Sequence, residues 1–125
     1  MRKKESITYK KEMARKRRVK AIRKKISGTE ERPRLVVFRS VQNIYGQIID
    51  DQSGKTMVSF STIAKEEKID TSKKKTEQSF AAGLKLGEKA INQGIKKICF
   101  DRNGYLYHGR VKAFAEGARK AGLEF

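Results

Sequence analysis

The chain is poor in the residues that crosslink or stiffen small proteins. Its 125 residues include one Cys, one Pro and one His, and no Trp. The single cysteine, Cys99, excludes an internal disulfide or a cysteine-rich zinc site, and its apolar surroundings predict a buried structural thiol. No apolar run approaches the ~18 residues of a membrane span, and the first residues lack a signal-peptide core. We therefore expect one soluble, cytoplasmic protein whose core forms without crosslinks.

Acidic residues are also scarce relative to basic ones. The chain has 31 Lys or Arg against 14 Asp or Glu, which gives a net charge of +17. Residues 1–25 alone contain 13 basic and two acidic residues. This imbalance predicts a polyanionic partner or, less often, an anionic membrane surface. The change in composition also predicts a basic N-terminal arm over residues 1–27 and a single α/β domain over residues 28–125.

The basic arm has a helical pattern. Val19, Ile22 and Ile26 recur at helical spacing, and no glycine or proline interrupts the segment before Gly28. We predict a helix over 8–26 whose narrow apolar stripe docks on the domain or on a partner. The arm could be a solvated tail, but its charge density favours nucleic-acid binding, because each phosphate contact releases counterions.

The rest of the chain alternates between strand and helix patterns. Residues 28–33 form a predicted linker. The predicted strands cover 34–39, 44–49, 56–61 and 95–100, and the predicted helices cover 74–93 and 109–121. These elements predict a mixed sheet of order 3-2-1-4, with strand 2 antiparallel and two packed helices. Gly83 and Gly87 lie within the first of these helices, where we expect them to allow close packing of helix on sheet.

The segment between the fourth strand and the last helix is the strongest candidate site. Arg102 and Arg110 can grip phosphates in a forked geometry. Tyr105 and Tyr107 alternate along the chain, so we expect both rings on one side, where they could stack on bases. The free amides at the start of the following helix favour an anion. In the alternative interpretation one tyrosine packs on the sheet edge and His108 merely caps a turn.

The turn between the first two strands carries a second cluster of binding side chains. Arg39, Ser40, Asn43 and Tyr45 combine a cation, short polar groups and an aromatic ring. The first and fourth strands are predicted to be parallel neighbours. We therefore expect this turn to lie beside the segment that follows the fourth strand and to form with it a composite RNA-binding surface.

Carboxylates at strand ends raise the question of catalysis, because this strand order also occurs in metal-dependent nucleases. Two-metal chemistry requires carboxylates that converge on ions ~3.5–4 Å apart. Asp50 and Asp51 are expected at the end of the sheet opposite Asp101, and the first strand has no carboxylate. We therefore expect turn formation rather than catalysis. No Ser-His-Asp, Walker or dinucleotide signature is present either.

Several segments together resemble the bacterial uL18 family of large-subunit ribosomal proteins. They cover residues 31–35, 37–40, 44–45, 48–51, 59–62, 100–113 and 119–125. The resemblance implies a fold akin to ribonuclease H without its active site. It further implies binding of 5S rRNA, contact with 23S rRNA and ribosomal protein L5, and a place in the central protuberance of the cytoplasmic ribosome. Asn103 stands where the family frequently has glycine, and asparagine can adopt the same left-handed backbone conformation.

Residue chemistry and the resemblance together predict an RNA-binding surface with no catalytic residue, metal, cofactor or small-molecule substrate. Its predicted members are Arg15, Lys16, Arg17, Arg18, Lys20, Arg23, Lys24, Arg34, Arg39, Ser40, Asn43, Tyr45, Ser61, Thr62, Arg102, Tyr105, Tyr107, His108, Gly109, Arg110 and Lys112. Two alternatives stay open at this point. One is a nonspecific nucleic-acid-binding protein, and the other is a metal-dependent nuclease.

Overall fold

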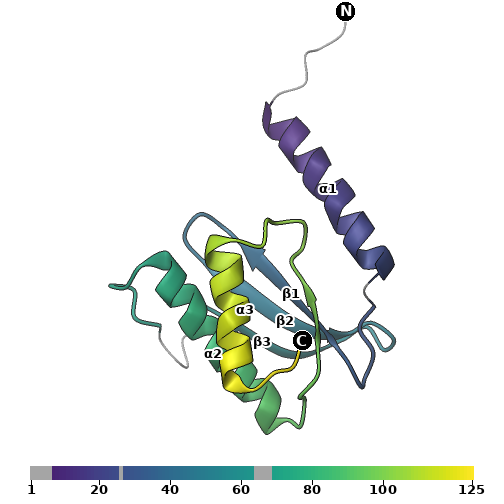
Figure 1. The fold of residues 1–125 in the computed structure, drawn as a ribbon. Coiled ribbons are helices and arrows are strands. Elements are labelled where there is room, and N and C mark those ends of the chain that lie inside the picture. Colours follow the sequence, from purple (N-terminus) through teal and green to yellow (C-terminus); the bar gives the residue numbers. More distant parts are fainter. Residues whose placement is uncertain (1–6, 26, 64–68) are drawn as a thin grey trace, which may run out of the picture.

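Figure 1 shows a computed structural model of the chain, which describes residues 7–25, 27–63 and 69–125. In chain order, its elements are α1 (Ile7–Lys25), β1 (Arg34–Arg39), β2 (Ile44–Asp50), β3 (Lys55–Ser61), α2 (Lys75–Asn92), β4 (Cys99–Asp101) and α3 (Gly109–Ala121). The helices agree with the predicted ones to within one residue in the described ranges, and Ile26 lies outside those ranges.

The strands form one mixed sheet in the order β3-β2-β1-β4. β2 is antiparallel to both β1 and β3, whereas β1 and β4 are parallel. The predicted strand order and directions are therefore confirmed. The two short turns that join β1, β2 and β3 force the antiparallel meander, and the crossover through α2 returns the chain to the other side of β1.

The last strand, β4, is shorter than predicted. Ile95 and Ile98 are buried, as their apolar character requires, but neither belongs to the strand. The amide of Ile95 donates to the carbonyl of Ala90 (2.9 Å), and that of Ile98 donates to Glu124 (3.1 Å). The apolar run therefore reflects burial in the core, and the backbone around Lys97 pairs with Glu124 after α3 rather than with β1. The thiol of Cys99 is only half-buried, contrary to prediction, and lies 3.8 Å from the carbonyl oxygen of Arg32.

Helices α2 and α3 lie side by side over one face of the sheet (Figure 1). The core between them and the sheet is built from residues at alternate positions of the strands, including Leu35 and Val37 of β1, together with Leu86 and Phe114 from the helices. The first four residues of β1 are buried on both faces, as its continuous apolar run predicts. In the described ranges, no helix is long and apolar enough to cross a membrane.

The glycines of α2 serve helix-on-helix packing rather than the predicted helix-on-sheet packing. A methyl group at Gly83 would collide with the backbone of Phe114 in α3, and one at Gly87 would lie 2.5 Å from the Cβ atom of Ala121. The correction has a simple cause. A glycine shows that a helix is approached closely, but sequence alone does not show which neighbour approaches it.

The first prediction concerns this helix contact. Gly83→Ala is expected to lower the free energy of unfolding by about 1–3 kcal/mol, because the collision with the α3 backbone outweighs the ~1 kcal/mol gain in helix propensity. Urea denaturation followed by circular dichroism measures the change. The control is Glu88→Ala on the exposed side of the same helix, which should stay within about 0.5 kcal/mol. A more stable Gly83→Ala variant would contradict the close approach.

Candidate nucleic-acid interface

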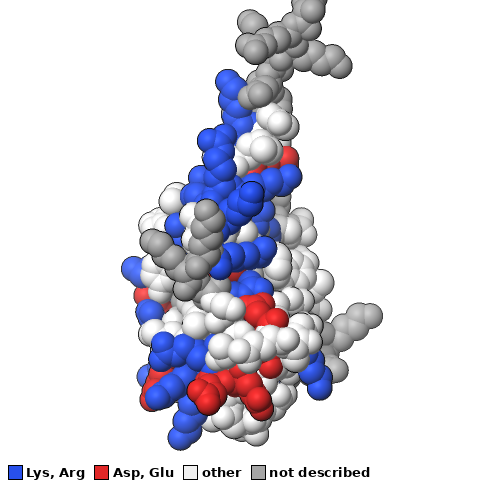
Figure 2. All heavy atoms as spheres, turned by 90° about the vertical axis from the view of Figure 1, so that its right-hand side faces the viewer, with Lys and Arg blue, Asp and Glu red and all other residues white. Residues whose placement is uncertain are grey.

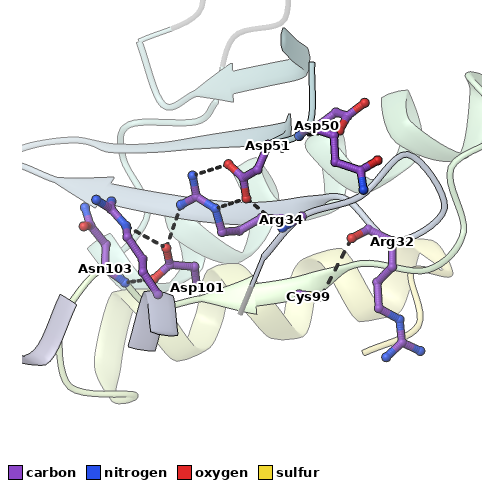
Figure 3. A network of polar contacts seen from close by, with 10 residues as sticks. Arg32, Arg34, Asp50, Asp51, Cys99, Asp101 and Asn103 are labelled. Atoms are coloured by element: carbon purple, nitrogen blue, oxygen red, sulfur yellow. Dashed lines mark hydrogen bonds and ion pairs between the residues drawn. The ribbon is translucent and has the colours of Figure 1, made fainter. Parts of the chain in front are cut away.

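A buried arginine lies beneath the candidate interface and joins two strand ends (Figure 3). Arg34, at the start of β1, is 9% exposed. Its Nε and Nη2 atoms each donate to the carboxylate of Asp51 at 3.0 Å, and its Nη1 atom donates to Asp101 at 2.7 Å. This forked geometry suits a guanidinium group between two carboxylates. Arg34 therefore supports the interface from below, and its charged group is already engaged with protein.

This geometry corrects the expectation that Asp51 and Asp101 lie apart. In strand register Asp101 pairs with Val36, and Asp51 lies just beyond the start of β1. Both carboxylates are therefore near Arg34, whose side chain reaches them. The cation between them is the guanidinium group, which fills the space that a shared metal would need. Asp50 forms the predicted turn instead, because it accepts hydrogen bonds from the amide of Gln52 (3.0 Å) and the hydroxyl of Ser53 (3.1 Å).

Asp51 also fixes the segment predicted to be a linker. Its carboxylate accepts a hydrogen bond from the amide of Gly28 (2.6 Å), and its own amide donates to the carbonyl of Gly28 (3.0 Å). The hydrogen bonds from Arg34 are the largest cause that lowers the pKa of Asp51, and the bond from the Gly28 amide lowers it further. Partial burial opposes this shift, but the pKa stays below its usual value. The same interaction raises the pKa of Arg34. The chain is therefore anchored to the sheet directly after α1.

Asp101 connects the network to the segment that follows β4. Its side chain is fully buried, and its Oδ1 atom accepts a hydrogen bond from the amide of Asn103 (2.8 Å). Arg23 of α1 approaches the same carboxylate from outside, with 3.7 Å between its Nε atom and Oδ2. Asn103 has a φ angle of 54°, which confirms the predicted left-handed conformation. The carboxylate thus orients both the loop and the C-terminal end of α1.

Helix α1 packs against Gly104, in the loop after β4. Its φ angle is 76°, and a methyl group there would lie 2.8 Å from both the carbonyl oxygen of Arg15 and the side chain of Val19. The Nε atom of Arg18 donates to the carbonyl of Gly104 at 2.8 Å. The guanidinium group of Arg15 lies 4.3 Å from the ring centroid of Tyr105. Hence Val19, part of the predicted apolar stripe, docks on the domain.

The segment after β4 and the β1–β2 turn are adjacent, as predicted. The hydroxyl oxygen of Tyr105 accepts a hydrogen bond from the amide of Arg39 (3.3 Å), and Arg39 places its guanidinium carbon 5.0 Å from the ring centroid. Arg110 donates from Nη1 to the carbonyl of Val41 at the tip of the turn (3.3 Å). Arg102 braces its own loop by donating to the carbonyl of Tyr105 at 2.6 Å.

The two tyrosines of this segment do not share a side, which corrects the prediction. Tyr107 packs edge-on against Phe100, with ring centroids 5.9 Å apart, and its hydroxyl oxygen accepts a hydrogen bond from Arg119 (3.3 Å). It thus packs on the edge strand, as the alternative interpretation held. Alternation fails because residues 102–108 form turns rather than a strand. His108 is the N-cap residue of α3, but its side chain makes no capping hydrogen bond.

The polar residues of the β1–β2 turn hold the turn itself. The Ser40 hydroxyl accepts a hydrogen bond from the amide of Asn43 (3.1 Å), and Asn43 Oδ1 accepts one from the hydroxyl of Thr62 (2.9 Å). Tyr45 and Ser61 face each other across β2 and β3. These side chains shape the tip, so a phosphate or a ribose would meet a preformed surface there.

A cleft of about 970 Å³ lies between α1, the end of β1 and the loop after β4. Its basic lining residues are Arg15, Lys16, Arg17, Lys20, Arg23 and Arg39. The remaining lining residues are Met13, Val19, Phe38, Asn103 and Tyr105, so no acidic side chain of the described residues lines it. Figure 2 shows Lys and Arg crowded along α1 and the adjoining surface, with most Asp and Glu nearer the other end. Such a concave positive surface concentrates a polyanion.

The cleft brings together only some of the predicted binding residues. Seven of them line it, namely the six basic residues and Tyr105. The side chains of Arg18 and Arg34 point to protein partners, and Lys112 lies 4.0 Å from Glu116 on α3. Gly109 begins α3 with a φ angle of 56°. The side chain of Lys24 lies outside the described residues. Phe38 also lines the cleft; the sequence placed it beside Arg39 and Ser40 at the β1–β2 turn but not among the RNA-binding residues.

Two buried donors beside the cleft have no acceptor among the described residues. They are the Nε atom of Arg15 and the Nδ2 atom of Asn103. A buried donor without an acceptor costs about 1–3 kcal/mol. Both atoms belong to residues that line the cleft between α1 and the loop after β4.

A mixed α/β domain with a basic helix and a positively charged cleft is the architecture expected of a protein that binds a polyanion. The chain belongs to the ribosomal L18 family. The model of that family, described as ribosomal L18 of archaea, bacteria, mitochondria and chloroplasts, matches residues 9–125.

Curated relatives agree with this membership. The large ribosomal subunit protein uL18 of Desulfotalea psychrophila is 54% identical over 115 residues, which cover 92% of this chain and 95% of that protein. The protein of the same name from Pelotomaculum thermopropionicum is 59% identical over 110 residues, covering 87% and 90%. That from Bacillus cereus is 50% identical over 115 residues, covering 92% and 95%. These relatives are structural ribosomal proteins and not enzymes, which removes the nuclease alternative.

The second prediction tests the buried arginine. Arg34→Met should lower the free energy of unfolding by about 3–5 kcal/mol, because the buried carboxylate of Asp101 loses its closest counter-charge. Urea denaturation of the variant measures this loss. Arg32→Met, at an exposed arginine two residues earlier, is the control and should change stability by less than about 0.5 kcal/mol. Equal losses of stability in the two variants would show that the ion pairs of Arg34 contribute no more than an exposed arginine does.

The third prediction concerns pH. The folded-state pKa of Asp51 lies below its unfolded value near 3.8, so its ionised form stabilises the fold above that pH. This contribution is lost as the pH falls below 3.8 toward the lowered pKa. Asp51→Asn should therefore be less stable than the wild type at neutral pH, and the two stability curves should converge in acid. Glu31→Gln is the exposed control. A stability difference that is independent of pH would contradict this interpretation.

Proposed function

We propose that this chain is a structural component of the large ribosomal subunit that binds ribosomal RNA. The observation that carries the proposal is the cleft, which six basic side chains and no acidic one line in the part of the chain that the structure describes. Membership of the ribosomal L18 family, together with the printed names of the relatives, supports the assignment to the large subunit.

We further propose 5S rRNA as the principal ligand. In this proposal the protein helps to attach 5S rRNA to 23S rRNA in the central protuberance, beside ribosomal protein L5, in the cytoplasm. These finer assignments rest on the resemblance of the sequence to the bacterial uL18 family. The structure supports them with a surface that spans two separate elements, α1 and the loop after β4. Such a surface can hold two segments of a folded RNA at once.

Shape and phosphate contacts should dominate the recognition. The deep, narrow major groove of A-form RNA hides the base edges from side chains, so a rigid basic surface reads the backbone instead. Lys16, Arg17 and Lys20 are exposed on α1 and line the cleft, where they are available to phosphates. Arg15, Arg18 and Val19 contact the loop, and these contacts set the angle at which α1 presents the three exposed basic side chains.

The fourth prediction tests this proposal by salt titration. The affinity of the full chain for 5S rRNA should fall steeply with salt, because counterions are released on binding. Replacing Lys16, Arg17 and Lys20 together by alanine should reduce the slope of log affinity against log salt concentration by about 2–3, since each phosphate contact contributes about 0.7–0.9. Filter binding over a salt series gives both slopes.

The control changes the net charge by the same amount at the far end of the sheet. Lys96, Lys97 and Lys120 are exposed there, outside the cleft, and their replacement by alanine should leave the slope nearly unchanged. A flat salt response of the wild-type chain would refute RNA binding through this surface. Equal affinity of the wild-type chain for 5S rRNA and for random duplex DNA would favour the nonspecific nucleic-acid-binding alternative.

A further inference from the structure

We propose that the cleft receives an unpaired nucleotide of RNA and that its base stacks on the ring of Phe38. The inference rests on the proposed function, because it deepens the same surface. It assigns to the cleft a chemical class of ligand, the unstacked nucleobase, that the basic residues alone do not specify.

Phe38 is an aromatic ring that the fold leaves open to the cleft. Leu35 and Val37 of β1 point into the core beneath α2 and α3, so Phe38 projects from the opposite face. It is 38% exposed and lines the cleft. In register, it lies directly opposite the half-buried Tyr45 of β2. An aromatic ring in this position exposes apolar surface that a stacked base would remove from water.

The other aromatic ring of the cleft is already engaged. Tyr105 lies 4.3 Å from the guanidinium carbon of Arg15 and 5.0 Å from that of Arg39, and its hydroxyl oxygen accepts a hydrogen bond from a backbone amide. Within the described part of the chain, no ring or cation stacks on Phe38. The ring of Tyr105 is therefore held in place between two arginines, whereas the ring of Phe38 is available to stack on a base.

The mixture of side chains fits an unpaired nucleotide better than a duplex backbone. A duplex offers phosphates and sugars to a protein surface. The apolar lining residues Met13, Val19 and Phe38 would make no favourable polar contact with these groups. An unpaired base presents a flat π-face to an aromatic ring, and its flanking phosphates can meet the surrounding Arg and Lys residues. The cleft volume of about 970 Å³ leaves room for the base together with the adjoining backbone.

The test compares single-stranded with double-stranded RNA. Phe38→Leu keeps an apolar side chain but removes the ring. It should weaken binding of short oligoadenosine by about 5- to 150-fold, the range expected for loss of one stacked base. Binding of a fully paired RNA duplex should change by less than about twofold, because the basic residues are intact. Phe80→Leu is the matched control, since Phe80 is 36% exposed on α2 outside the cleft, and it should alter neither affinity.

A second variant keeps the platform and adds a signal. The chain has no tryptophan, so the indole introduced by Phe38→Trp is the only one present. Oligoadenosine should quench its fluorescence, the paired duplex should not, and the affinity should match that of the wild type. Equal weakening of both RNAs by Phe38→Leu, no weakening at all, or an unquenched indole would each overturn the proposal.

These outcomes are separate from those that test the proposed function. If the wild-type chain fails to prefer 5S rRNA over duplex DNA, the ribosomal assignment fails while the oligoadenosine comparison still decides the role of Phe38. If 5S rRNA binds as proposed but Phe38→Leu behaves like Phe80→Leu toward oligoadenosine, only the stacking platform is refuted. Circular dichroism of all three variants checks that the exposed positions leave the fold intact.

Discussion

The guanidinium group of Arg34 is the interaction on which the geometry of the candidate interface depends. It joins the carboxylate of Asp51, directly after β2, to that of Asp101, the last residue of β4. Through Asp51 it fixes Gly28, where the chain enters the domain, and through Asp101 it orients the loop on which α1 rests. A buried charge is tolerated only when its partners have good geometry, so any arrangement that separated these groups would leave a carboxylate unpaired in the interior. The placement of the basic residues of α1 thus depends on a network whose charged groups are engaged with one another.

The placement of α1 explains why its charge is useful. A helix this basic repels itself in isolation, because like charges lie on every side of it. Contact with the loop relieves part of this repulsion, since Arg18 donates to the carbonyl of Gly104 and Arg15 lies over the Tyr105 ring. Two buried donors at this contact, Arg15 Nε and Asn103 Nδ2, have no acceptor in the described structure. In the proposed function, a polyanion in the cleft would supply counter-charge to the basic residues of α1.

The sequence predicted the sheet order and the helices because those depend on short-range patterns and on the handedness of crossovers. The sequence-based predictions were wrong where burial, or the length of a single side chain, determines the structure. Ile95 and Ile98 are buried in the core before β4 begins, and the same apolar pattern would suit a strand. Asp51 and Asp101 lie near each other because β4 pairs only with the start of β1, so one arginine side chain reaches both carboxylates. Tyr105 and Tyr107 diverge because turns intervene, so period-2 alternation does not apply.

Phe38 shows why the binding surface was harder to predict than the fold. A phenylalanine at the fourth or fifth position of an apolar run reads as core, and only the position of α1 shows that its ring borders a cleft instead. The basic residues of that cleft attract any polyanion and cannot distinguish paired from unpaired RNA. An aromatic ring among them adds a term that depends on base exposure, because only an unstacked base can cover it. If the proposal holds, the basic residues set the affinity for RNA, and the ring of Phe38 selects unpaired over paired RNA.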